Sequence, residues 1–103
     1  MGQLHTAAKT KDLPPGGCMG VEINGVEIAI FNLGGTYFAL EDNCPHSGAP
    51  LSEGDIDGDT VVCPWHGAVF KLADGSVQCP PAETGVTSYR VEIDGDDIKI
   101  ELP

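Results

Sequence analysis

The chain has 103 residues, of which 16 are acidic and only five are basic, and its formal net charge is −11 at pH 7. The few cations are scattered and form no basic stripe, which excludes nucleic acid as a partner and makes an anionic membrane surface repulsive. A chain of this length predicts one domain, residues 1–103, and its acidity favours protein partners with a basic docking face.

The sequence features that bear on location favour the cytoplasm. No apolar run reaches the roughly 18 residues of a membrane-spanning helix, so we expect no membrane insertion. The N-terminal residues do not resemble a secretion signal, so we expect a cytoplasmic location. A disulfide between Cys18 and Cys79 stays an alternative for an oxidising compartment, but we expect both to be small buried hydrophobic residues.

The first predicted strands surround tight turns. Residues 21–32 alternate between apolar and polar side chains around Asn24-Gly25, a dipeptide typical of a type I′ hairpin turn. A further strand over residues 36–40 follows the Gly34-Gly35 turn. These segments predict antiparallel strands joined by short loops.

The second half of the chain continues the same pattern. A short strand is expected over residues 60–63, and residues 67–77 predict two strands joined by an Asp74-Gly75 turn. Residues 88–102 alternate on both sides of Asp94-Gly95, which indicates another hairpin. Gly and Pro interrupt every candidate helix, so the fold class is predicted to be all-β, a sandwich or small barrel.

Two loops of this scaffold gather sulfur and nitrogen ligands. They have the form Cys-x-His and Cys-x-x-His, are separated by sixteen residues, and supply Cys44, His46, Cys63 and His66. Zinc accepts two thiolates and two imidazoles, but a structural zinc finger usually places its histidines on a helix, and none is predicted here. A binuclear iron–sulfur cluster fits better, because each loop then gives one ligand to each iron.

This double motif resembles the two cluster loops of the Rieske family. The similar segments are CPHSGAPLSEG and CPWHGAVFKLADGSV, and the resemblance extends over roughly Val21–Leu102. It implies a three-layered antiparallel β-sandwich with two cluster-binding loops at one tip, and electron transfer as the activity. It also implies a third loop over the cluster, for which Cys79–Gly85 is the candidate. The implied cofactor is one [2Fe–2S] cluster, held by Cys44, His46, Cys63 and His66.

The flanking residues predict a low reduction potential. Two thiolates neutralise the charge of the oxidised core, so the potential is expected within about −150 to +300 mV. High-potential members of the family carry a cysteine pair and two hydroxyl donors, where this chain has Ala49, Trp65, Ala68 and Phe70. Fewer hydrogen bonds to the cluster stabilise its reduced form less, which favours the low end of the range.

The leading functional hypothesis is a soluble ferredoxin that carries single electrons from a reductase to an oxygenase. The alternative is a small subunit of a larger reductase, such as an assimilatory nitrite reductase, whose sequences the first motif also resembles. A structural zinc module stays a further alternative. An oxygenase needs a mononuclear iron held by two histidines and a carboxylate, but only His5, expected at the surface, is left over. No catalytic activity is therefore expected from the chain alone.

Overall fold

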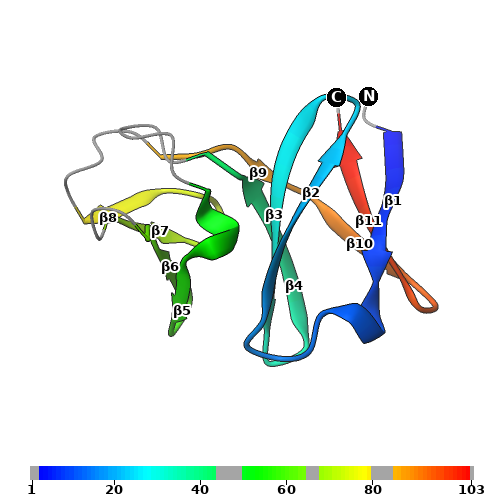
Figure 1. Ribbon diagram of the computed structural model, residues 1–103, viewed down its shortest axis with the longest axis horizontal. Coiled ribbons are helices and arrows are strands. Elements are labelled where there is room, and N and C mark those ends of the chain that lie inside the picture. The colour runs from blue at the N-terminus through cyan, green and yellow to red at the C-terminus, as the bar shows by residue number, and fades with distance from the viewer. Residues whose placement is uncertain (1–2, 44–49, 65–67, 80–84, 103) are drawn as a thin grey trace.

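The computed structural model describes the whole chain except residues 1–2, 44–49, 65–67, 80–84 and 103 (Figure 1). The described strands form three antiparallel sheets. The terminal sheet consists of β1 (Gln3–Lys9), β11 (Asp97–Leu102) and β10 (Val91–Asp94). The central sheet consists of β2 (Cys18–Ile23), β3 (Val26–Leu33), β4 (Thr36–Glu41) and β9 (Ser88–Tyr89). The short-stranded sheet consists of β5 (Asp55–Asp57), β6 (Thr60–Val62), β7 (Val69–Lys71) and β8 (Val77–Cys79).

The central sheet lies between the other two, which confirms the three-layered sandwich (Figure 1). Strand β3 is buried on both of its faces because its side chains alternate between two cores. Ile28 and Ile30 belong to the core shared with the terminal sheet. Ala29 and Phe31 belong to the core shared with the short-stranded sheet. The two cores therefore meet back to back across the central sheet.

The predicted hairpin turns are confirmed by their backbone angles. Asn24 and Gly25 have φ of 52° and 81°, and a type I′ turn requires positive φ at both central residues. In the last hairpin Asp94 pairs with Asp97, so Gly95 is the first of the two turn residues, with φ of 61°. No α-helix occurs among the described residues, which contain only the single turns η1 (Thr10–Asp12) and η2 (Leu51–Glu53). Neither helix is long or apolar enough to cross a membrane.

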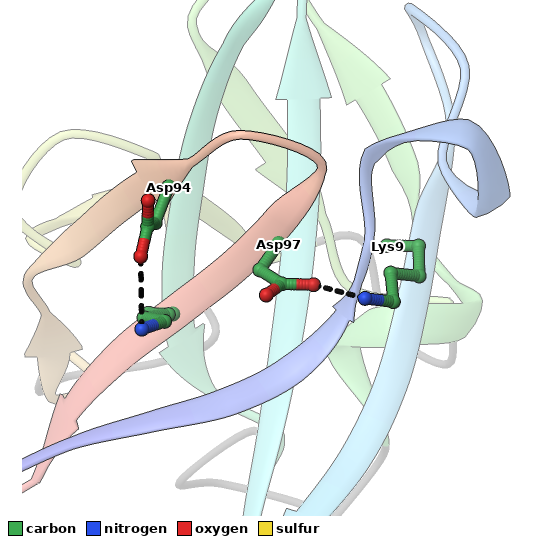
Figure 2. Close-up of polar contacts among 4 residues, drawn as sticks. Lys9, Asp94 and Asp97 are labelled. Atoms are coloured by element: carbon green, nitrogen blue, oxygen red, sulfur yellow. Dashed lines mark hydrogen bonds and ion pairs between the residues drawn. The ribbon is translucent and has the colours of Figure 1, made fainter.

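Strand β1 was not predicted, and it brings the two ends of the described chain together. It pairs with β11 from Gln3 opposite Leu102 to Lys9 opposite Asp97. Lys9 also forms an ion pair with Asp97 (Figure 2). The terminal sheet is therefore closed by residues that are almost a whole chain length apart.

The register of the short-stranded sheet brings the bases of three loops to one end. Asp55 pairs with Val62, Val62 pairs with Val69, and Val69 pairs with Cys79. These four residues form one row across the sheet. In this row Asp55 follows the first motif, and Val62 and Val69 lie on either side of the second. Cys79 begins the candidate third loop. The end of the first loop, both ends of the second and the start of the third therefore lie side by side.

Candidate iron–sulfur site

Cys63 is the predicted ligand that the structure describes. It follows β6 directly and is 2% exposed, in a core that also contains Ala68 and Phe70, both completely buried. Its backbone N–H donates to the carbonyl of Ala68 over 2.7 Å, which closes the base of the second loop. The other three predicted ligands, Cys44, His46 and His66, lie outside the described residues.

The surroundings of Cys63 fit an iron ligand. The ligating form of cysteine is the thiolate. Burial among apolar side chains disfavours a thiolate unless a positive charge offsets its desolvation, and an iron ion supplies that charge. Neither Ala68 nor Phe70 carries a hydroxyl group that could hydrogen-bond to a cluster sulfur. Cys63 therefore offers a thiolate ligand for a cluster in a buried, apolar environment.

The first loop is closed at its base by two hydrogen bonds from Ser52 to Asp42. The Ser52 backbone N–H donates to Asp42 Oδ1 and the Ser52 hydroxyl donates to Asp42 Oδ2, each over 2.8 Å. Asp42 is only 9% exposed and precedes Cys44 by two residues. Its own backbone N–H donates to the carbonyl of Glu27 over 3.0 Å, which fixes this end of the loop to β3.

A close contact joins the first loop to the second. A Cβ atom placed on Gly54 would lie 2.2 Å from the carbonyl oxygen of Val62, the residue before Cys63. No side chain can occupy that space, so only glycine allows the two backbones to approach in this way. The segment that leaves the first loop therefore contacts the strand that leads into the second.

The end of the candidate third loop, Cys79–Gly85, is fixed to the turn between β7 and β8. The Val86 N–H donates to the carbonyl of Gly75 over 2.8 Å. A Cβ atom on Gly75 would lie 2.1 Å from the Val86 carbonyl oxygen, and one on Gly85 would lie 2.4 Å from the Gly75 carbonyl oxygen. Residues 80–84 of this loop lie outside the described part of the chain.

Cys18 both packs against the core and forms a hydrogen bond through its thiol. Its side chain is partly buried against the core, and its thiol donates to the carbonyl of Ser52 over 3.1 Å. Burial raises the pKa of this thiol, and the nearby carboxylates of Asp55 and Asp42 raise it further. Cys18 is not in a disulfide bond, so the alternative of a disulfide between Cys18 and Cys79 is not supported.

Sequence reasoning missed the residues that close these loops. Asp42, Ser52 and Gly54 flank the first motif, and Gly75 belongs to a predicted turn. Their position near the motifs was the one feature of the sequence that could have indicated a role. Their partners, however, lie up to eleven residues away along the chain, so no short pattern identifies the pairs. His5 lies away from the motifs, on β1 of the terminal sheet, and is partly buried where the sequence predicted a surface position.

A model of the Rieske [2Fe-2S] domain family matches residues 3–90 of the chain. The chain belongs to the Rieske family. Its cofactor is accordingly one [2Fe–2S] cluster. The family match begins at β1, eighteen residues before the start of the resemblance noted from the motifs.

Similar proteins include ferredoxins of two dioxygenase systems. The 3-phenylpropionate/cinnamic acid dioxygenase ferredoxin subunit of Escherichia coli K12 is 42% identical over 98 residues, which cover 94% of this chain and 92% of the relative. A structure of the complex of reduced oxygenase and oxidised ferredoxin in carbazole 1,9a-dioxygenase contains a chain that is 30% identical. That match covers 94% of this chain and 91% of the other, with a TM-score of 0.88.

The Rieske fold is shared with a second group of proteins. A Mycobacterium tuberculosis protein, provisionally assigned as an NADH-dependent nitrite reductase small subunit, superposes with a TM-score of 0.92 at 26% identity. The superposition covers 100% of this chain and 97% of that protein. Both functional hypotheses from the motifs therefore have a structural counterpart.

Proposed function

We propose that residues 1–103 form one Rieske domain that acts as a soluble cytoplasmic ferredoxin and carries single electrons from a reductase to an oxygenase. Cys44 and Cys63 bind one iron of the cluster, and His46 and His66 bind the other. The observation that carries this proposal is the row of paired residues in the short-stranded sheet. In this row Asp55, which follows the first ligand loop, lies beside Val62 and Val69 at the two ends of the second, which supports a cluster shared by both loops.

The chain's own residues prepare this site for one-electron chemistry, which the cluster supplies when bound. The hydrogen-bonded loop bases restrict how far the ligands can move between redox states. Buried side chains such as Leu51 and Phe70 exclude water from the sulfur of Cys63. The absence of hydroxyl groups at Ala68 and Phe70 supports a low potential. Among the relatives, the Escherichia coli protein is a ferredoxin subunit of a dioxygenase, which supports the oxygenase as acceptor.

An acidic surface beside the first loop supports a partner with a basic face. Two adjoining hollows of about 330 and 320 Å³ share Glu22 and Glu27 in their walls. One hollow also contacts Asn43 and the other Pro50, the residues at either end of the first loop. Glu22 pairs directly with Glu27 across the strands, an arrangement that is unfavourable unless cations approach it.

The described ion pairs lie elsewhere. All four are in or beside the terminal sheet, where Lys99 contacts Asp94 over 3.1 Å and Lys9 contacts Asp97 (Figure 2). The carboxylates of Glu22 and Glu27 belong to none of these pairs. The uncompensated negative charge next to the loops is therefore available to attract a basic partner and to speed the encounter.

Iron and sulfide analysis tests the cofactor assignment. The purified protein should contain about two irons and two sulfides per chain. Zinc without sulfide would rule out the electron-carrier proposal. The reduced protein should be re-oxidised quickly by its oxygenase in stopped-flow mixing, whereas the isolated chain should turn over no substrate with NAD(P)H alone. Substrate turnover by the isolated chain would overturn the carrier assignment.

Charge neutralisation tests the docking face. Glu22→Gln combined with Glu27→Gln should slow electron transfer several-fold at low ionic strength and weaken its salt dependence. Glu92→Gln combined with Asp94→Asn changes the net charge equally but on the terminal sheet, so its effect should be smaller. Equal effects of the two double variants would mean that only the total charge matters and that this face has no docking role.

The small-subunit function is the second candidate, favoured by the superposition on the Mycobacterium tuberculosis protein. A subunit of a larger reductase should co-purify with it at high salt, because permanent interfaces are larger and more apolar than transient ones. A carrier should instead dissociate readily as ionic strength rises. Co-expression with the flanking genes, followed by size-exclusion chromatography at low and high salt, separates the two functions.

A further inference from the structure

Ser52 lies just beyond the first ligand loop, and its three polar groups are all hydrogen-bonded. Its N–H and its hydroxyl both donate to the carboxylate of Asp42, and its carbonyl accepts the thiol proton of Cys18. Asp42 directly follows β4, and Cys18 is the first residue of β2. A single residue after the loop is therefore held by two separate strands of the central sheet.

The fold makes room for this arrangement. A Cβ atom on Gly20 would lie 2.9 Å from Asp42 Oδ2 and 2.9 Å from the Ser52 hydroxyl oxygen, so β2 passes the pair closely where it has no side chain. Asp42 is 9% exposed, and a carboxylate with so little contact with water needs hydrogen bonds to both oxygens. Ser52 supplies one bond to each oxygen, and such charge-assisted bonds are stronger than neutral ones.

We propose that Cys18, Asp42 and Ser52 form a clasp, the Ser52 clasp, that positions the first ligand loop. The inference rests on the proposed function, which assigns Cys44 and His46 as ligands. Asp42 holds the chain two residues before Cys44, and Ser52 holds it after the loop. The separation of the loop ends is thus set by the central sheet, independently of the cluster. Asp42 is a positioning residue, because it acts on the ligands through the backbone.

Two substitutions of one residue separate geometry from charge. Asp42→Ala removes both acceptors of Ser52. Asp42→Asn keeps an oxygen for the Ser52 N–H and offers an amide group to the Ser52 hydroxyl, so it preserves the clasp without its charge. We expect Asp42→Ala to release iron to a chelator about 10- to 100-fold faster than the wild type. Asp42→Asn should restore most of the difference. Ser52→Ala, which removes only the hydroxyl bond, should lie between the wild type and Asp42→Ala.

The chain offers a matched control in the turn between β7 and β8. There the Ser76 N–H and hydroxyl donate to Asp74 Oδ1 over 2.9 and 2.7 Å, the same chemistry as in the Ser52 clasp. This turn is at the end of the short-stranded sheet away from the row of loop bases. Because Gly75 of this turn also binds Val86 beyond the third loop, Asp74→Ala should accelerate release much less than Asp42→Ala, even where it lowers the unfolding midpoint.

Two measurements on the cluster-loaded protein decide the proposal. The first is the decay of visible absorbance after chelator is added, and the second is hydrogen exchange of the Ser52 amide, which should be faster in Asp42→Ala. Release at the wild-type rate in Asp42→Ala, or equal acceleration in Asp74→Ala, would overturn the clasp. Failure of the proposed function is recognised separately, as zinc in the wild-type protein. The same comparison of release rates, made with zinc, then still supports or overturns the clasp.

Discussion

Replacing Gly54 with alanine should destabilise the protein, although the backbone there suits alanine. Gly54 has φ of −80° and ψ of −175°, an extended conformation that alanine adopts freely. By conformational entropy alone, the substitution would stabilise the fold by about 0.4–1 kcal/mol. The new Cβ atom, however, would lie 2.2 Å from the Val62 carbonyl oxygen, whereas real contacts do not fall below 3.0 Å. The two backbones must therefore separate by about 0.8 Å.

That separation has a cost which can be estimated. Overpacking of this kind costs about 1–3 kcal/mol. Weakening the hydrogen bonding where Asp55 pairs with Val62 adds about 0.5–1.5 kcal/mol. We expect Gly54→Ala to lower the free energy of unfolding by about 0.5–4 kcal/mol, which is these two costs less the entropic gain. It should also lower the iron content, because Val62 precedes Cys63. Urea unfolding followed by circular dichroism measures the first quantity, and iron analysis measures the second.

Gly58→Ala is the control for this prediction. Gly58 has φ of +61° and no neighbour within 4 Å of a new Cβ atom, so the substitution costs backbone strain of about 1–2 kcal/mol without displacing any neighbour. Its iron content should stay at the wild-type level. If Gly54→Ala proved as stable as the wild type, the close approach of the two loops would not be a constraint, and the reasoning would be wrong.

Two further predictions concern the potential and a thiol. The midpoint potential should be below zero, nearer about −150 mV than +300 mV. Ala68→Ser and Phe70→Tyr should each raise it by about 20–60 mV, which equals one neutral hydrogen bond of about 0.5–1.5 kcal/mol for a single electron. A clearly positive midpoint in voltammetry would contradict this. Cys18 should react with iodoacetamide at pH 8 more slowly than an exposed cysteine, because burial and two carboxylates raise its pKa. Asp55→Asn lowers that pKa and should speed the reaction, as mass spectrometry of the Cys18 peptide would measure.

The sequence was most informative where local chemistry dictates structure. Asn24-Gly25 predicted its turn because few other residues tolerate positive φ at both positions. The double motif identified the family because two loops with these ligand types at this spacing rarely arise for another reason. Both signals are contained in short segments, so no knowledge of distant contacts was needed.

Features that depend on distant partners were not predictable in the same way. Strand β1 has little alternation of its own, and it is a strand because β11 provides hydrogen bonds from the other end of the chain. Strand β5 has only three residues, two of them aspartates, and it exists because β6 pairs with it. The bond from Ser52 to Asp42 closes a loop of ten residues, and no local pattern signals it.

The pairing of β1 with β11 also bears on how the protein is made. The ribosome synthesises β1 well before its partner strand β11, so the terminal sheet cannot close until Gln3 meets Leu102. Until then the apolar faces of Ile28 and Ile30 lack the covering layer provided by Ile98 and Ile100. The nascent chain therefore exposes one of its two cores until β11 has been made, by which time the loops with the proposed cluster ligands have already been synthesised. Cluster insertion and completion of the fold can thus occur in either order, and a chaperone that covers the open face would protect the chain in the interval.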